Sequence, residues 1–167
     1  MRKLFLGFNL LLLGLLGTPV QADEPPVTIP VHRLSVEMAV KAAQAAMEAC
    51  RKKGLSVAVT VVDRGGHAQV VLRDTLAMPV TLAISEQKAY TAMNFNADTS
   101  ALKGRFDSPF APGKVDGLIL YPGAVPISPG STIVGGIGVS GAPTGETDEE
   151  CARAGREAII TDLEMAM

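Results

Sequence analysis

The connections between the apolar segments of this chain are short, and this constrains its fold more than any other feature. Residues 55–62 form an almost unbroken β-branched and apolar run, an Asp-Arg-Gly-Gly turn follows at 63–66, and residues 68–73 resume the same character. Turns of this length join antiparallel strands, whereas parallel strands need a crossover of about a dozen residues or more. Pro-Gly and Gly-Gly pairs separate three further apolar segments, at 118–121, 125–128 and 132–139. The pattern predicts a sheet of five strands, mostly antiparallel.

Three segments have the apolar spacing of α-helices. The first follows a potential N-cap, Ser35, and runs to Lys53, the second covers residues 81–95, and the last begins at Thr147. A short helical turn is expected at 100–106, in a polar stretch that contains prolines. The order α, ββ, α, βββ, α predicts an α/β (α+β) fold in which helices flank one sheet.

The composition is that of one folded domain. Hydrophobic residues make up 47% of the 167 residues and charged residues 19%, which excludes a mainly disordered chain. The formal net charge of -2 and the absence of Trp argue against nucleic-acid binding. The two Cys and two His do not form short pairs, which excludes a closed zinc site or an iron–sulfur cluster.

Residues 1–22 have the features of a secretory signal peptide. Two basic residues precede an apolar run at 4–16, and small residues follow at 20–22, where a signal peptidase would cleave. The run is shorter than the ~20 residues that span a bilayer, which disfavours a membrane anchor. We therefore expect a periplasmic or secreted protein without a stable membrane anchor. Residues 23–33 are expected to form an extended arm, and residues 34–167 a single domain.

Export would place Cys50 and Cys151 in an oxidising compartment, where disulfides persist. Cys50 lies at the end of the first expected helix and Cys151 near the start of the last. Two alternatives stay open: a disulfide between these helix ends, or two buried thiols that pack as small hydrophobic groups.

Four segments, taken together, resemble one known family. They are residues 61–66 (Val-Val-Asp-Arg-Gly-Gly), 87–92 (Gln-Lys-Ala-Tyr-Thr-Ala), 135–141 (Gly-Gly-Ile-Gly-Val-Ser-Gly) and 148–155 (Asp-Glu-Glu-Cys-Ala-Arg-Ala-Gly). In this order and spacing the chain resembles the GlcG/HbpS family of haem-binding and haem-degrading domains from about residue 34 to residue 160. Residues 96–102 and the export signal look most like the secreted HbpS branch. The resemblance implies a profilin-like, three-layer α/β/α fold, homo-oligomers that are commonly octamers, and haem bound near subunit contacts.

Two of these segments also have a structural explanation. The turn at 63–66 needs glycine for a positive φ, and its Asp can accept hydrogen bonds from its own backbone. The glycines at 135–138 lie in or before a strand and are not followed directly by a helix, which disfavours a dinucleotide site. They favour the close approach of a second backbone or of a flat ligand.

Haem requires an apolar slot, an axial donor to its iron, and polar partners for two propionates. Candidate iron donors are His32, in the segment before the first helix, Tyr90, on the second helix, and His67, after the hairpin glycines. Each has a structural alternative, because exposed histidines and aromatic core residues are common.

Hydroxyl and cationic side chains complete the candidate site. The resemblance to the HbpS branch implies a threonine near the haem, and Thr91 and Thr99 lie in the matching segments. Helix and cap chemistry explains both threonines as well. Lys88, Arg73 and Arg105 are candidate partners for the propionates, with surface ion pairs as the alternative.

Three functions stay open on the sequence. The first is a haem-binding protein in uptake, buffering or slow degradation; the others are a catabolic enzyme for a small organic substrate and a ligand-free assembly module. No Ser-His-Asp or Cys-His arrangement identifies a nucleophile. Family members with surface iron sites have a Glu-x-x-Glu pair, and here only Glu146 and Glu149 have that spacing. Helix-start preferences explain these two residues, so an iron-sensing role is not expected.

Overall fold

The computed structural model describes residues 25–105, 107 and 115–167. The chain divides into two compact units, Met1–Pro30 and Val31–Met167. The described part of the first unit contains no helix or strand. The expected signal peptide and Phe106, the last residue of the expected helical turn, lie outside the described residues. No helix in the described part of the chain has the length and apolar character needed to cross a membrane.

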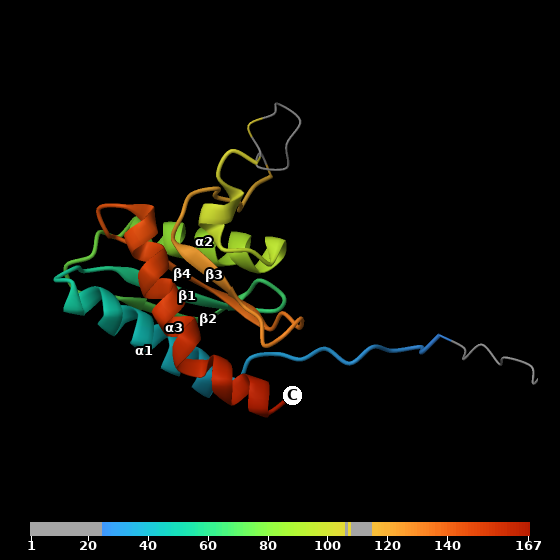
Figure 1. The fold of residues 1–167 in the computed structure, drawn as a ribbon. Helices are drawn as coiled ribbons and strands as arrows, with labels where there is room; N and C mark the ends of the chain where they lie inside the picture. The colour runs from blue at the N-terminus through green and yellow to red at the C-terminus, as the bar shows by residue number, and fades with distance from the viewer. Residues whose placement is uncertain (1–24, 106, 108–114) are drawn as a thin grey trace, which may run out of the picture. The chain divides into compact units, whose positions relative to one another are not determined.

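One antiparallel sheet forms the centre of the second unit (Figure 1). Its strands, in the order β2-β1-β4-β3, are β1 (Ala58–Asp63), β2 (Ala68–Arg73), β3 (Ala124–Ile127) and β4 (Gly135–Ser140). β1 and β2 are the expected hairpin, with Val61 opposite Val70. Ile137 of β4 lies opposite Val61 on one side and Val125 on the other, so a row of aliphatic residues crosses the sheet.

The prediction of a fifth strand at residues 118–121 is wrong, because the sheet in the described residues has four strands. Gly117 and Gly123, with φ of 87° and 135°, bend the backbone on both sides of this segment. The N–H of Ile119 donates to the side-chain oxygen of Thr91 on a helix, at 3.0 Å, and not to a neighbouring strand. The segment is apolar because it lies against that helix and lines a cavity, not because it belongs to the sheet.

Within the described residues, three α-helices and one 3-10 helix accompany the sheet. They are α1 (Val36–Lys52), α2 (Thr81–Phe95), η1 (Thr99–Leu102) and α3 (Gly145–Met165). Ser35 caps α1 as predicted, accepting a hydrogen bond from the N–H of Met38 at 3.3 Å. α2 has its predicted bounds, and η1 begins one residue before the predicted turn and overlaps it at residues 100–102. α3 begins earlier than predicted, because the Thr144 side chain caps it by accepting from the N–H of Thr147 at 3.2 Å.

The helices cover both faces of the sheet. α1 and α3 lie side by side on one face, and α2 lies on the other (Figure 1). The main core fills the space under α1 and α3, while a smaller cluster under α2 contains Val62, Ala89 and Met93. The α+β class is confirmed, and the likeness of these layers to profilin stays a prediction.

The glycines of β4 let α2 pack directly on the sheet. A Cβ on Gly138 would lie 2.2 Å from the carbonyl oxygen of Ser85, and one on Gly136 would lie 2.6 Å from that of Ala89. The close approach expected here is therefore between two backbones. It also brings the hydroxyls of Ser85 and Thr60 within 2.8 Å of each other in the buried layer between α2 and β1.

Cys50 and Cys151 form a disulfide between α1 and α3, with an S–S distance of 2.11 Å and Cα atoms 5.6 Å apart. Both residues are fully buried. Of the two alternatives left open by the sequence, the structure contains the cross-link, which closes a loop across a sequence separation of 101 residues.

Candidate functional site

A half-open cavity of about 370 Å³ lies where α2, residues 119–121, the end of β4 and the start of α3 meet. Its lining combines aliphatic and thioether side chains with one ammonium, one carboxylate and one phenol. The residues are Met78, Val80, Thr81, Ile84, Lys88, Ile119, Tyr121, Ser140, Gly141, Ala142, Pro143, Gly145 and Asp148. We call it the Lys88 cavity.

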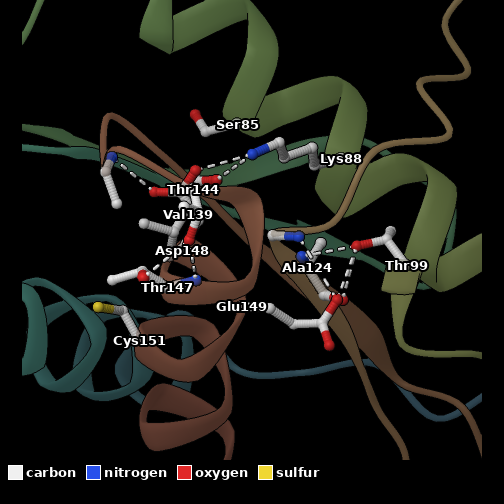
Figure 2. Close-up of polar contacts among 12 residues, drawn as sticks. Ser85, Lys88, Thr99, Ala124, Val139, Thr144, Thr147, Asp148, Glu149 and Cys151 are labelled. Atoms are coloured by element: carbon white, nitrogen blue, oxygen red, sulfur yellow. Dashed lines mark hydrogen bonds and ion pairs between the residues drawn. The ribbon is translucent and has the colours of Figure 1, made fainter. Parts of the chain in front are cut away.

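Lys88 forms a buried ion pair at this cavity. Its side chain leaves α2, and its Nζ lies 2.9 Å from Oδ2 of Asp148 and 3.1 Å from the carbonyl oxygen of Val139 (Figure 2). Lys88 is 1% exposed. Gly123 makes room for it, because a Cβ there would lie 2.4 Å from Nζ. The ring of Tyr121 lies on another side, with its centroid 5.4 Å from Nζ, within the range of a cation–π interaction.

Asp148 lies in the first turn of α3 and is also buried. Its Oδ1 accepts a hydrogen bond from the N–H of Ala142 at 2.9 Å, and Oδ2 accepts from Lys88. Burial raises the pKa of Asp148, whereas the charge and hydrogen bond of Lys88 lower it; burial has the larger effect. The pair is therefore held against a desolvation cost, and ion pairs of this kind contribute little net stability.

The entrance of the cavity is apolar and exposed. Met78, Val80 and Tyr121 are 64%, 57% and 53% exposed. The entrance also has two groups that can donate an electron pair to a metal, the thioether of Met78 and the phenol of Tyr121. The site can thus hold a ligand with a broad apolar surface and polar groups, with a charged pair at its floor.

Three of the four segments that carry the family resemblance meet at this ion pair. Lys88 belongs to residues 87–92, Val139 to residues 135–141, and Asp148 begins residues 148–155. Sequence reasoning selected Lys88 and missed Asp148 and Tyr121. The signal for Asp148 was its place in a matching segment, but an acidic residue in the first turn of a helix has a general explanation in the helix dipole. Nothing in the sequence pattern indicated that Tyr121 faces Lys88.

A second buried network lies next to the first and involves Thr99 (Figure 2). The hydroxyl of Thr99 accepts from the N–H of Ala124 at 3.0 Å and lies 3.1 Å from Oε2 of Glu149. Glu149 also accepts from the backbone N–H and the side chain of Ser100 and from Arg153. These contacts fasten η1 and β3 to α3. Glu149 is buried and Glu146 is exposed, so the two carboxylates do not form a surface pair.

The structure does not bring the remaining sequence candidates together. Tyr90 lines a separate cavity of about 340 Å³ with Gly66 and Gly117. Thr91 is buried, donating to the carbonyl of Gln87 at 2.7 Å and accepting from residue 119.

The other candidates lie on the surface. His32 and His67 are exposed, and Nδ1 of His67 lies 3.6 Å from Oδ1 of Asp63. Arg73 donates to the carbonyl of Ala77, and Arg105 is exposed. The described residues contain no cluster of three or more His, Cys, Asp or Glu side chains suited to a metal ion. The roles of these residues toward haem stay predictions.

Comparisons with known proteins agree with this architecture. The family model "Haem degrading protein HbpS-like" matches residues 34–157. Protein GlcG of Escherichia coli strain K12 is 33% identical over 112 residues, which cover 64% of this chain and 81% of GlcG. A double mutant of Streptomyces reticuli HbpS has a crystal structure with a TM-score of 0.75 and 40% identity, covering 86% of this chain and 97% of that one.

A crystal structure of a PduOC complex with haem has a TM-score of 0.68 and 25% identity, covering 76% of this chain and 95% of that one. The match of the family model over most of the chain, together with these relatives, assigns the family. The chain belongs to the HbpS-like family of haem-degrading proteins.

Proposed function

We propose that this protein binds haem at the apolar entrance of the Lys88 cavity. It does so as a periplasmic or secreted homo-oligomer, and holds haem for uptake, buffering or slow degradation. The observation that carries the proposal is the exposed entrance formed by Met78, Val80 and Tyr121 around a cavity with a charged floor. An exposed apolar surface rimmed by polar groups is a common feature of ligand-binding sites.

The residues present fit the group in two respects. The walls are apolar, as the macrocycle requires, and the phenol of Tyr121 and the thioether of Met78 are donors that iron accepts. Haem, when bound, supplies the iron and its redox chemistry. A cavity of about 370 Å³ is at the small end of the roughly 300–1,000 Å³ of ligand pockets, so part of a porphyrin would lie over the rim. A second copy of the chain covering that part would account for an oligomer.

Lys88 acts on the polar side of such a ligand. The ammonium of Lys88 is already paired with Asp148. A propionate would therefore bind an ammonium that it shares with Asp148, and not a free positive charge. The pair keeps a fixed positive and a fixed negative group at the floor of the cavity and orients an unsymmetrical ligand.

The test is a haemin titration, followed by the Soret absorbance, of four variants in two matched pairs. Val80→Asp places a charge at the entrance, and Val36→Asp places the same charge on α1, where the wild-type side chain is also exposed. Tyr121→Phe removes the phenol at the Lys88 cavity, and Tyr90→Phe removes the phenol at the other cavity.

We expect saturable binding that Val80→Asp weakens by about tenfold or more, since burying a carboxylate against an apolar ligand is unfavourable, and that Val36→Asp leaves unchanged. A change in the Soret band with Tyr121→Phe alone would identify the donor. Loss of binding with Tyr90→Phe but not with Val80→Asp would contradict this location. Absorbance that never saturates in the wild-type protein would contradict haem binding itself.

The ion pair also favours a second candidate, an enzyme or binding protein for a small organic acid. A buried ammonium and carboxylate at one cavity can bind a carboxylate and exchange a proton with it. If haemin binds without saturation, thermal-shift measurements with small carboxylic acids test this function. A stabilisation that Lys88→Met abolishes would support it.

A further inference from the structure

Residues 26–31 alternate apolar and other side chains in the pattern of a β-strand, although they belong to no strand in the structure. Val27, Ile29 and Val31 are 101%, 78% and 63% exposed. We propose that this segment adds as an extra strand to the edge strand β2 of a second copy of the chain. The proposal is independent of the ligand.

The positions of the prolines make the segment a strand with one usable edge. In a β-strand the N–H and C=O of a residue point to one edge, and those of the next residue point to the other. Pro26 and Pro30 have no N–H, and they share one edge with Thr28. Val27, Ile29 and Val31 direct complete N–H and C=O pairs to the other edge. The segment can therefore pair with one strand, while the prolines prevent further strands from adding.

β2 is an edge strand that is suited to receive it. It lies at the end of the sheet order, so its outer edge has no neighbouring strand in the described residues. Val71, in its middle, is 47% exposed. Gln69, also on β2, has a buried side-chain oxygen without a hydrogen-bond donor in the described part of the chain. A strand added at this edge would cover Val71 and bring donors close to Gln69.

The contacts of Arg33 and Leu34 favour the β2 of a second copy over the β2 of the same chain. The carbonyl of Leu34 accepts from Nε2 of Gln69 at 3.0 Å, and Nη1 of Arg33 lies 3.2 Å from Oδ2 of Asp63. Gln69 is the second residue of β2, and Asp63 is the last residue of β1, at the hairpin turn. From Leu34 back to Arg33, the chain thus runs toward the hairpin turn. To lie along its own β2 it would have to reverse direction, whereas the β2 of a second copy needs no reversal.

Two proline substitutions test this pairing, each made in the full chain as the cell processes it. Ile29→Pro removes an N–H from the pairing edge, and Thr28→Pro removes one from the edge that already contains two prolines. We expect Ile29→Pro to raise the dissociation constant of the oligomer by about tenfold, because each of two exchanged strands loses a backbone hydrogen bond. Thr28→Pro should stay within about twofold of wild type. Light scattering after size exclusion over a dilution series measures both.

Because Ile29→Pro also removes an apolar side chain, a second experiment locates the segment directly. A photo-cross-linking residue replaces Thr28, and ¹⁵N-labelled and unlabelled proteins are mixed, dissociated and reassembled before irradiation. Cross-links from residue 28 to residues 68–73 that join a labelled to an unlabelled peptide support exchange between copies. Cross-links to β2 within one chain only, cross-links only to other elements, or equal effects of the two proline substitutions would overturn the proposal.

Discussion

Replacing Lys88 by Met separates the charge of the buried ion pair from its packing. Met keeps a long unbranched side chain of similar volume in the space beside Gly123 and removes the ammonium. Asp148 is then a carboxylate, 3% exposed, without a cation. The substitution therefore measures what the ammonium contributes to that carboxylate.

The structure sets the magnitude. Removing one member of a buried ion pair costs about 3–5 kcal/mol of unfolding free energy, because the other charge stays buried without its partner. Asp148 keeps the N–H of Ala142 at 2.9 Å, which places the expected loss near the lower value, at about 3 kcal/mol at pH 7. The double variant Lys88→Met with Asp148→Asn leaves no charge at either position. It should lose less than the single Lys88→Met variant.

The loss depends on pH in a definite direction. Burial raises the pKa of Asp148 against the opposing effect of Lys88, so removing Lys88 raises this pKa further. A carboxyl whose pKa is raised on folding contributes stability below its unfolded pKa of about 3.9, and that stability is lost as the pH rises through the folded pKa. The Lys88→Met variant should therefore be closer to wild type at pH 5 than at pH 8. The slope between the two pKa values is at most about 1.4 kcal/mol per pH unit.

Urea unfolding followed by far-UV circular dichroism at pH 5 and pH 8 measures these differences. All samples are compared at one protein concentration, because any self-association would make the stability depend on concentration. A loss below about 1 kcal/mol at pH 8 would refute the reasoning. So would a loss that is equal at the two pH values, because Asp148 would then not be the group left without a partner. A double variant less stable than the single variant would show that Asp148 is held mainly by groups other than Lys88.

Three further predictions concern the disulfide, the hairpin turn and the glycines of the fold. Replacing Cys50 and Cys151 by Ala should lower the unfolding free energy by up to about 4–5 kcal/mol, since the disulfide closes a loop across 101 residues; an unchanged urea midpoint would contradict this. Asp63→Asn should cost about 1–2 kcal/mol at pH 7. Burial raises the pKa of Asp63, but backbone hydrogen bonds and neighbouring positive charges outweigh it, so the pKa is lowered. This stabilisation is present above the unfolded pKa and is lost as the pH falls through the folded pKa, so variant and wild type should converge in acid. Gly138→Ala should lower the unfolding free energy by about 3 kcal/mol, because its Cβ would lie 2.2 Å from a carbonyl oxygen of α2. Gly54→Ala, with open space but a φ of 74°, should cost only about 1 kcal/mol, and equal urea midpoints for the two variants would contradict this.

The elements that sequence reasoning located correctly are those whose signals are local. Ser35 caps a helix with its own hydroxyl, and the glycines after Asp63 supply a turn within four residues. The apolar spacing of residues 81–95 predicted α2 with its bounds. Residues 118–121 have the local character of a strand. Their backbone instead bonds to Thr91, which lies much earlier in the chain. The spacing of apolar residues and the composition of a segment do not indicate which distant residue it will contact.

The candidate site shows the same division. Lys88 was selected because its segment resembles a family motif, while its partner depends on how α2 and α3 pack around the end of β4. The roles expected for Thr91 and Thr99 toward haem were assigned from the resemblance. In the structure both hydroxyls hold the backbone of neighbouring segments, at Ile119 and Ala124. A hydroxyl that is buried and already bonded on both sides is available to a ligand only if that segment moves.

The convergence of the motif segments on one ion pair indicates why these segments occur together. A buried lysine and aspartate stabilise a fold little compared with well-packed apolar side chains of the same volume. Gly123 has no side chain where Nζ of Lys88 lies, and the glycines of β4 bring α2 close enough for that lysine to reach Asp148. Several positions thus accommodate a charge that stability alone does not require. The economical explanation is that the charge is used at the cavity it lines, so Lys88→Met should impair ligand binding more than its effect on folding accounts for.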